Sequence, residues 1–276
     1  MIEKKYGIIG SPLSHSLSPM LHNFWFKKYK INASYSLIKI EVDQIENIIN
    51  KIRKKELQGI NVTVPYKQAV IPLLDLIIND AKETSSVNII YLNNENKIVG
   101  DNTDVCGFEQ AFINKLNNND LIGKKILVLG AGGVTLSVIF ALTKKKIKQI
   151  FISNRTVKKA EDIKKKFPFI EIVLWENISD KSEDVDIIIN ATSLGMKGGG
   201  DFKEVFKKCK SSLIYYDVIY NPAETTTLKN FKKQEIKTFN GLEMFLYQGQ
   251  KSFFLWNKIN PQLDEELKKI IISELR

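Results

Sequence analysis

The glycine-rich stretch at residues 125–137 constrains the fold of this 276-residue chain more than any other segment. Ile126–Leu129 is a short apolar run, typical of a strand buried in a parallel sheet. Gly130, Gly132 and Gly133 follow it, and the next residues have a helical pattern. Such a turn forms an anion site, because glycines let backbone N–H groups approach a pyrophosphate and the helix dipole favours negative charge. A plain turn is the alternative, but the strand before the glycines and the helix after them favour a dinucleotide site.

The composition is that of an ordinary globular protein, with 43% hydrophobic and 26% charged residues. No apolar run approaches the length of a membrane span, and the N-terminus lacks the apolar core of a signal peptide. Two cysteines are too few for a disulfide framework, and neither they nor His15 and His22 have metal-ligand spacing. We therefore expect a cytoplasmic protein with no membrane association and no metal.

The net charge of +10 raises the possibility of a nucleic-acid partner. The lysines are, however, scattered along every predicted helix, as at residues 144–146 and 164–166, and no basic-aromatic module is present. Solvated helix faces explain this pattern better, so we expect no nucleic acid. The positive field still attracts small anionic ligands.

Hydrophobic patterning predicts an α/β fold in two domains, residues 1–104 and 105–240. Residues 105–118 read as a connecting helix, and two closing helices return toward the first domain over about 241–276. Strands are expected at Tyr6–Gly10, Ser34–Ile40, Gly59–Val62, Val87–Leu92, Lys97–Val99, Ile126–Leu129, Lys148–Ile152, Ile170–Trp175, Val185–Ile189, Leu213–Asp217 and Ile236–Phe239. Helices are expected at Pro19–Tyr29, Val42–Lys54, Gln68–Ile78, Val134–Leu142, Val157–Phe167, Phe202–Cys209, Leu242–Trp256 and Leu263–Leu275.

The end of the second strand in the glycine-turn domain selects the dinucleotide. Enzymes that bind NAD usually carry Asp or Glu there, to hold the ribose hydroxyls. Here the strand runs into Asn154, Arg155 and Thr156, with Lys159 shortly after. Arg155 can stack on adenine and face a 2′-phosphate, which favours NADP. The alternative is a surface turn in which Thr156 caps the next helix.

Lys67 follows a predicted buried strand, at the sheet edge where open α/β sheets bind ligands. A lysine there can donate a proton or polarise a carbonyl, although a lone lysine is more often solvated. Asp101 and Asp104 can cap the connecting helix, and one of them can pair with Lys67. The hydroxyl-rich segment before the first helix suits a carboxylate or sugar-like ligand, with Ser18 as a simple N-cap the alternative.

Nine segments occur in one order and together resemble the shikimate dehydrogenase family, over residues 7 to about 250. They are Gly10-x-Pro-x-x-His-Ser-x-Ser-Pro-x-x-His-Asn23, Asn61-Val-Thr-Val-Pro-Tyr-Lys67, Val87-Asn88, Gly100-Asp-Asn-Thr-Asp104, Gly130-x-Gly-Gly133, Asn154-Arg-Thr156, Asn190-Ala-Thr-Ser-x-Gly-Met196, Tyr216-Asp-x-x-Tyr-x-Pro222 and Gly241-x-x-Met-x-x-x-Gln248.

The resemblance implies reversible, NADPH-dependent reduction of 3-dehydroshikimate to shikimate. It implies a substrate domain at residues 1–104, a Rossmann-type doubly wound NADP(H) domain at 105–240, and a cleft between them. The catalytic pair is then Lys67 and Asp104. The implied substrate contacts are Ser16, Ser18, Thr63, Asn88, Tyr220 and Gln248. The implied cofactor contacts are Gly130, Ala131, Gly132, Gly133, Val134, Asn154, Arg155, Thr156, Lys159, Thr192, Ser193, Ile219 and Gly241.

Three positions depart from the family pattern, namely Val105, Ser137 and Glu243, and none removes a catalytic group. The nearest rival is a quinate/shikimate dehydrogenase that also uses NAD, which Arg155 disfavours. A remote rival is a non-catalytic binding protein of the same fold. We expect a monomer or homodimer whose partners are small molecules.

Overall fold

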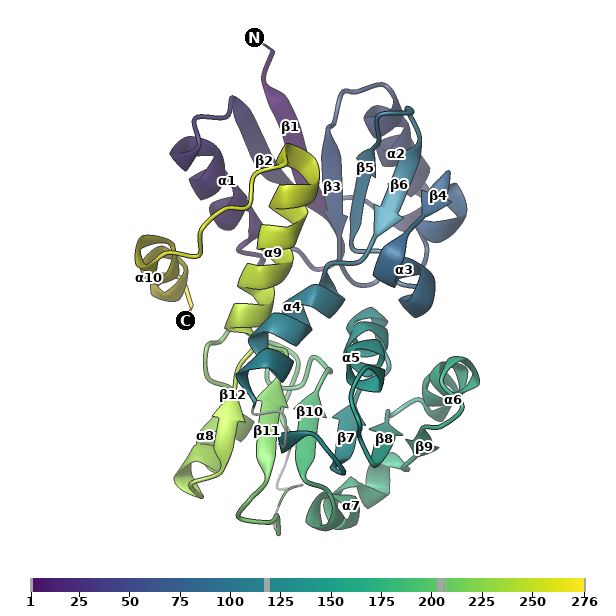
Figure 1. Ribbon diagram of the computed structural model, residues 1–276, viewed down its shortest axis with the longest axis vertical. Coiled ribbons are helices and arrows are strands. Elements are labelled where there is room, and N and C mark those ends of the chain that lie inside the picture. Colours follow the sequence, from purple (N-terminus) through teal and green to yellow (C-terminus); the bar gives the residue numbers. More distant parts are fainter. Residues whose placement is uncertain (1, 117–119, 203–205, 207, 276) are drawn as a thin grey trace. The chain divides into compact units, whose positions relative to one another are not determined.

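The computed structural model describes residues 2–116, 120–202, 206 and 208–275, and it divides into two compact units. The first unit comprises residues 1–107 and 246–274, and the second comprises residues 108–245 with the final two residues. The division falls inside two helices, α4 (Asp104–Ala111) and α9 (Leu242–Asn257), rather than at the helix starts expected from the sequence (Figure 1).

The first unit is built on a six-stranded mixed sheet in the order β2-β1-β3-β5-β6-β4. β5 is antiparallel to both β3 and β6, and the other pairs are parallel. β3 and β6 therefore run in the same direction, and their carboxyl ends lie at one edge of the sheet. The strands are β1 (Lys4–Ile9), β2 (Ala33–Ile38), β3 (Gly59–Val62), β4 (Leu76–Ile77), β5 (Ile89–Leu92) and β6 (Ile98–Asp101).

The helix expected at Gln68–Ile78 is wrong. The segment forms turns, a short 3-10 helix at Ile71–Leu73 and then the edge strand β4. Pro72 explains the difference, because proline lacks the N–H that a helix interior requires and restricts the residue before it. Asp75 then accepts a hydrogen bond from the Ile98 backbone N–H at 2.7 Å, which holds this edge beside β6.

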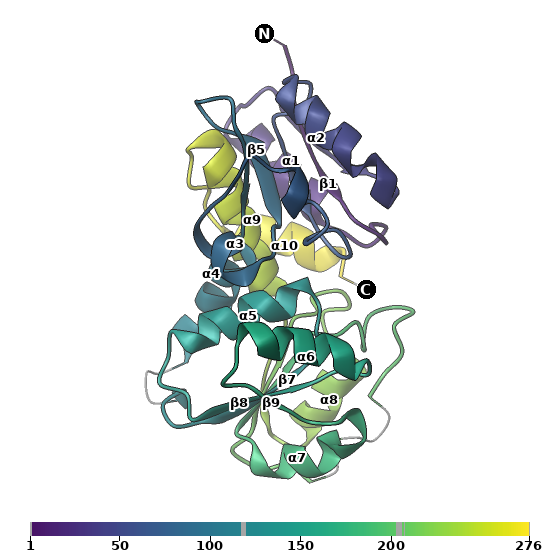
Figure 2. The ribbon, with the colours of Figure 1, turned by 90° about the vertical axis from the view of Figure 1, so that its right-hand side faces the viewer.

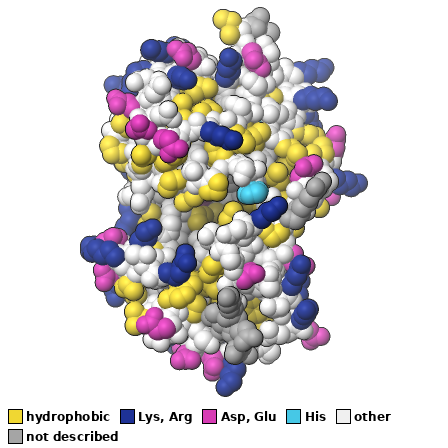
Figure 3. Space-filling model, turned by 180° about the vertical axis from the view of Figure 1, so that it is seen from behind, with side chains coloured by type: hydrophobic (Ala, Val, Ile, Leu, Met, Phe, Trp, Pro, Cys, Tyr) yellow, Lys and Arg dark blue, Asp and Glu magenta, His cyan; other side chains and the backbone are white. Residues whose placement is uncertain are grey.

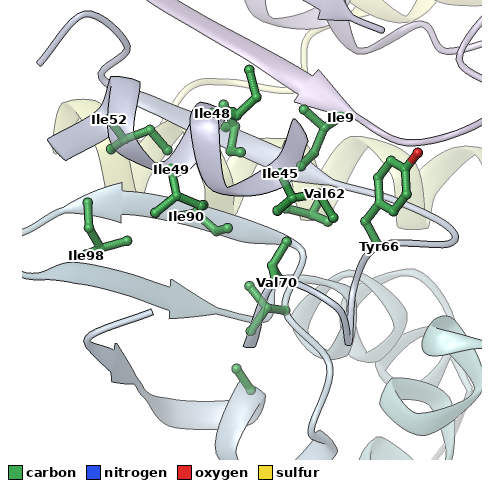
Figure 4. Close-up of a cluster of buried hydrophobic side chains, with 13 residues drawn as sticks. Ile9, Ile45, Ile48, Ile49, Ile52, Val62, Tyr66, Val70, Ile90 and Ile98 are labelled. Carbon is green, nitrogen blue, oxygen red and sulfur yellow. The ribbon is translucent and has the colours of Figure 1, made fainter. Parts of the chain in front are cut away.

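Helices cover both faces of the first sheet. On one face, isoleucines at helical spacing along α2 pack against the strands (Figure 4). On the other face, Trp25, Phe26, Phe253 and Trp256 from α1 and α9 form an aromatic cluster with Tyr6 of β1. The helices of this unit are α1 (Ser18–Lys28), α2 (Ile45–Arg53), α3 (Asn79–Thr84), most of α9, and α10 (Glu265–Ser273).

The second unit has a six-stranded parallel sheet in the order β12-β11-β10-β7-β8-β9. Counted from β7, this is the order 3-2-1-4-5-6 of dinucleotide-binding folds, with the switch point between β7 and β10. The predicted Rossmann-type doubly wound fold is confirmed. The strands are β7 (Lys125–Leu129), β8 (Gln149–Ser153), β9 (Glu171–Ile172), β10 (Ile187–Asn190), β11 (Ile214–Asp217) and β12 (Lys237–Phe239).

In the described part of the second unit, the helices that flank the sheet are α5 (Gly133–Thr143), α6 (Val157–Lys166), α7 (Ile178–Asp184) and α8 (Thr226–Lys233). Residues of α7 and α8 share an apolar cluster with β7, β8, β10 and β11, and Figure 2 shows α5 and α6 on the side away from α7. Helices α7 and α8 have no counterpart in the sequence prediction. Much of the helix expected at Phe202–Cys209, and the end of the one at 105–118, lie outside the described residues.

Candidate active site

Lys67 and Asp104 form a close ion pair at the carboxyl edge of the first sheet. Lys67 lies in the turns that follow β3, and Asp104 begins α4 shortly after β6. Lys67 Nζ lies 2.5 Å from Asp104 Oδ2, and the two side chains are only 12% and 9% exposed. Of the two sequence alternatives for Asp104, the pairing with Lys67 is therefore the one that the structure contains. A largely buried ammonium beside a fixed carboxylate can donate a proton to a bound oxygen atom.

Asn88 fixes the orientation of the Asp104 carboxylate. Its Nδ2 donates to Asp104 Oδ1 at 2.9 Å and to Thr103 Oγ1 at 2.9 Å, while its Oδ1 accepts from the Thr103 backbone N–H at 2.7 Å. A flipped amide would turn an oxygen toward the carboxylate, so only one orientation satisfies these bonds. Both oxygens of Asp104 thus have donors, one neutral and one charged.

The N-terminus of α4 is capped by Asn102 rather than by an aspartate. Asn102 Oδ1 accepts from the backbone N–H groups of Asp104 at 2.9 Å and Val105 at 3.2 Å. Asp101 instead accepts from the Asn102 backbone N–H and from Asn79 Nδ2. The prediction that Asp101 caps this helix is wrong. Because Asn102 supplies the cap, the Asp104 side chain is available to Lys67.

A second layer of buried polar groups lies behind Asn88, and the sequence analysis assigned no role to it. Asn61 Nδ2 donates to the Asn88 carbonyl at 3.1 Å and to Ser252 Oγ at 3.0 Å, and Tyr35 Oη donates to Asn61 Oδ1 at 2.9 Å. Ser252 Oγ also lies 3.3 Å from Thr103 Oγ1. The sequence signal for Ser252 was its position one helical turn after Gln248, a residue of the predicted site. In the structure both lie on α9, and the Ser252 hydroxyl donates to the Gln248 carbonyl.

The two serines of the first motif lie next to each other just after β1. Ser16 Oγ donates to Ser18 Oγ at 3.2 Å. Ser18 is the first residue of α1 and Leu17 occupies the N-cap position, so the N-cap alternative for Ser18 is wrong. The Ser18 backbone N–H donates to Ser16 Oγ at 3.4 Å. Thr63 follows β3, whose Val62 is paired with Ile9 of β1, and it therefore lies at the same edge of the sheet. Ser16 and Ser18 thus belong to the segment that follows β1, and Thr63 to the segment that follows the adjacent strand β3.

The glycine turn of the second unit has the geometry of an anion site. Gly130 has a φ of +105°, and a Cβ there would lie 2.7 Å from the Ala191 carbonyl oxygen, so only glycine fits between β7 and β10. Gly132 is the N-cap of α5, which begins at Gly133 with Val134 in its first turn. An added Cβ at Gly132 would meet nothing within 4 Å. The open space above this turn, together with the helix N-terminus, fits a pyrophosphate.

The residues after β8 leave a positive charge without a counter-charge. Arg155 is exposed and forms no ion pair with any acidic residue in the described ranges. Lys159 is exposed in the first turn of α6, and Asn154 Nδ2 donates to the Thr156 carbonyl at 2.9 Å. Thr156 occupies the N-cap position but its side chain makes no capping bond. The β8 strand ends in Ser153, which cannot repel a 2′-phosphate as an acidic residue would.

The remaining residues implied by the resemblance lie in two neighbouring loops. Thr192 and Ser193 follow β10, and Ile219 and Tyr220 follow the adjacent strand β11. The Tyr220 ring is stacked on Phe245, with centroids 4.4 Å apart. The Gly241 backbone N–H donates to the Ile219 carbonyl at 2.9 Å, and a Cβ at Gly241 would lie 2.0 Å from the Val218 carbonyl oxygen.

Histidines and cysteines do not form a metal site in the described part of the chain, where no group of three His, Cys, Asp or Glu residues could hold an ion. His22 is fully buried on α1, and its ring is stacked on Tyr35 with centroids 4.5 Å apart. Burial lowers the pKa of His22 to about 3. His22 therefore has the core role that the sequence allowed, as a neutral aromatic ring.

Basic side chains do not gather into one patch on the face shown in Figure 3, where lysines and arginines are interspersed with acidic residues. No described helix combines the length and the hydrophobicity needed to cross a membrane.

The dinucleotide-binding strand order, the glycine turn at its switch point and a separate unit with a lysine–carboxylate pair define a nicotinamide-dependent dehydrogenase. Residues 8–90 match the model of the shikimate dehydrogenase substrate binding domain, and residues 113–240 match that of shikimate / quinate 5-dehydrogenase. The chain belongs to the shikimate dehydrogenase family.

Similar proteins cover nearly the whole chain. The NADP(+)-dependent shikimate dehydrogenase of Pelagibacter ubique is 48% identical over 96% of this chain and 97% of its own. Shikimate dehydrogenase of Aquifex aeolicus superposes with a TM-score of 0.86 at 35% identity, covering 98% of this chain and 99% of its own. The enzyme of Thermus thermophilus, solved in complex with NADP(H) and shikimate, gives a TM-score of 0.83 at 26% identity, covering 99% and 100%.

Proposed function

We propose that this protein catalyses the reversible NADPH-dependent reduction of 3-dehydroshikimate to shikimate, with Lys67 and Asp104 as the catalytic pair. The observation that carries the proposal is the sheltered contact between Lys67 Nζ and Asp104 Oδ2, whose geometry Asn88 fixes. Membership of the shikimate dehydrogenase family supports the reaction and the cofactor. The pathway that uses this reaction supplies aromatic amino acids.

The catalytic pair stabilises the negative charge that develops on the substrate oxygen during the reaction. NADPH, when bound, supplies a hydride to the ketone carbon, so the carbonyl π bond breaks and its oxygen gains negative charge. Lys67 lies where it can give that oxygen a proton, and Asp104 orients the ammonium group. A proton from water then restores the pair.

The other polar groups of the first unit suit the functional groups of the substrate. We assign the carboxylate to the Ser16 and Ser18 hydroxyls, which lie 3.2 Å from each other at the start of α1. Thr63, Asn88 and Gln248 are assigned to the ring hydroxyls. Both hydrogens of Asn88 Nδ2 already have protein acceptors, so a substrate hydroxyl has to share them.

The second unit is assigned to NADP(H). The backbone of Gly130–Val134 binds the pyrophosphate, and Arg155 and Lys159 face the 2′-phosphate beside Asn154 and Thr156. The loops after β10 and β11 complete the site, with Thr192, Ser193, Ile219 and Gly241 along the dinucleotide and Tyr220 beside the nicotinamide and the substrate. The open space at Gly132 and the exposed Arg155 side chain are the features that fit this ligand.

The test is a crossed assay that follows nicotinamide absorbance, with shikimate or quinate combined with NADP⁺ or NAD⁺. Fast reduction with shikimate and NADP⁺ alone is the expected result. Comparable rates with quinate or NAD⁺ would place the protein in the broader quinate/shikimate class, and no rate in any combination would contradict the proposal. We further propose that the protein is cytoplasmic and is a monomer or homodimer. Sedimentation at several concentrations tests the oligomeric state.

A further inference from the structure

Asp217 is a carboxylate at the carboxyl end of β11 that is fully buried and has no assigned role. Within the described residues, no lysine, arginine or histidine forms an ion pair with it. A buried carboxylate without a counter-charge is costly, so its hydrogen bonds must compensate for that cost or the group must serve a function.

Four neutral donors from separate segments converge on this carboxylate. Oδ1 accepts from Asn190 Nδ2 at 3.1 Å and from the Ile219 backbone N–H at 3.0 Å. Oδ2 accepts from Thr225 Oγ1 at 3.0 Å and from Tyr215 Oη at 3.4 Å. A carboxylate offers about four acceptor sites, and here all four are used. Asp217 therefore joins the end of β10, the loop after β11 and the N-cap of α8.

The contact with Asn190 determines the conformation of the loop after β10. Because Nδ2 of Asn190 faces Asp217, its Oδ1 faces the loop and accepts from the Thr192 backbone N–H at 3.0 Å and the Thr192 hydroxyl at 2.7 Å. The Thr192 hydroxyl in turn accepts from the Leu194 backbone N–H at 3.0 Å. Asn190 Nδ2 also donates to the Leu194 carbonyl at 2.9 Å. A reversed amide would point Oδ1 at both the carboxylate and this carbonyl, so Asp217 helps to select the orientation that shapes residues 191–194.

The contact with Ile219 has the same effect on the loop after β11. The Ile219 backbone N–H donates to Asp217, and the Ile219 carbonyl accepts from the Gly241 backbone N–H. One side chain thus holds both loops that carry the proposed contacts Thr192, Ser193 and Ile219.

We propose that Asp217 is a positioning residue for dinucleotide binding, which holds the loops after β10 and β11 in the conformation that contacts NADP(H). This inference rests on the proposed function. It assigns no contact with the ligand to Asp217 itself, and it predicts a defect in nucleotide affinity that substrate affinity does not share.

The test compares Asp217→Asn with Asp186→Asn by calorimetric titration with NADPH and, separately, with shikimate. Asp186 lies just before β10, at the opposite end of the same sheet from Asp217. It accepts hydrogen bonds from the Lys125 backbone N–H and from Lys210 Nζ, so it is a matched control. We expect the dissociation constant for NADPH to rise about tenfold in Asp217→Asn, which corresponds to about 1.4 kcal/mol. Shikimate affinity of Asp217→Asn stays within about twofold, because most of the proposed substrate contacts lie in the first unit. Asp186→Asn binds NADPH normally, because Asp186 lies at the other end of the sheet from both loops.

A second pair of variants covers the case in which Asp217→Asn does not fold. Thr225→Val removes one donor to the carboxylate, whereas Thr225→Ser keeps the hydroxyl and the helix cap. We expect about threefold weaker NADPH binding for the valine variant and normal binding for the serine variant, because one bond of four is lost. Normal NADPH binding by folded Asp217→Asn, or by Thr225→Val where the first variant is unfolded, would overturn the inference. An equal loss of NADPH and shikimate affinity would overturn it too. Wild-type protein that binds no NADPH would instead refute the proposed function.

Discussion

Asn88 donates a hydrogen bond from Nδ2 to Asp104 Oδ1 at 2.9 Å, and this bond sets the direction of the carboxylate that pairs with Lys67. The Asn88 amide is itself held by the backbone and side chain of Thr103. The geometry of the lysine–carboxylate pair therefore depends on a residue that carries no charge. The lysine–carboxylate pair and the residues that orient it come from one structural unit.

Replacing Asn88 by alanine removes this orienting bond. A hydrogen bond to a charged group contributes about 1.5–3 kcal/mol, so kcat is expected to fall roughly 10- to 100-fold. Steady-state kinetics measure the effect, with circular dichroism to confirm folding. Asn94→Ala, in the exposed turn between β5 and β6, is the matched control and should leave kcat unchanged. A kcat within twofold of wild type in Asn88→Ala would exclude an orienting role.

Arg155 is expected to distinguish NADP⁺ from NAD⁺. Its guanidinium is exposed and has no acidic partner among the described residues, so it is available to a 2′-phosphate. We expect Arg155→Leu to raise KM for NADP⁺ about tenfold, the loss of one charge-assisted contact, while KM for NAD⁺ changes little. Parallel assays with the two nucleotides provide the control, and an equal change in both KM values would refute the assignment.

His22 makes stability depend on pH in acid. Burial lowers its pKa from 6.5 to about 3, so the unfolded chain binds the proton more readily than the folded chain between these values. The contribution of His22 to stability is present above pH 6.5 and is lost as the pH falls toward 3, by at most about 1.4 kcal/mol per pH unit. Urea unfolding of wild type and His22→Leu at pH 4.5 and 7 measures it. The unfolding free energy of wild type minus that of His22→Leu should be smaller at pH 4.5 than at pH 7. An equal value at both pH values would contradict the prediction.

Asp217 makes stability depend on pH in the opposite direction. Burial raises its pKa to about 7. Among the described residues its one ionisable hydrogen-bond partner is Tyr215, whose pKa burial raises well above 10, so that the phenol stays neutral. The folded chain therefore binds a proton that the unfolded chain releases above pH 4, and this contribution to stability is lost as the pH rises from about 4 to 7. Asp217→Asn should not show this decrease in stability, because asparagine does not titrate. Unfolding midpoints of both proteins across this range test it, and identical pH profiles would show that Asp217 does not titrate in the folded protein.

The sequence predicted most of the second unit because its signals are local. An apolar strand, three glycines and a helix lie within one short segment, and the parallel strands are continuous apolar runs. Helices α7 and α8 were missed because their sequences are largely polar and only a few residues, such as Ile178 and Phe231, are buried. Pro72 is the local signal that should have argued against a helix at Gln68–Ile78.

The candidate site was only partly visible in the sequence. Lys67 and Asp104 stand in recognisable motifs, and their contact was one of two open alternatives. The proposed orienting groups, Ser252 and Asp217, depend on partners that are distant in sequence, such as Asn61 for Ser252. Hydrogen bonds between remote segments leave no periodic pattern, so they emerge only from the folded structure.

The most direct measurement of the central claim compares Lys67→Ala with wild type in shikimate affinity and in turnover with NADP⁺. Lys67 is proposed to act on the reacting oxygen, so turnover should fall by roughly three orders of magnitude while shikimate still binds, with Lys54→Ala as the exposed control. Near-normal turnover in Lys67→Ala would contradict the claim that this lysine is the catalytic group.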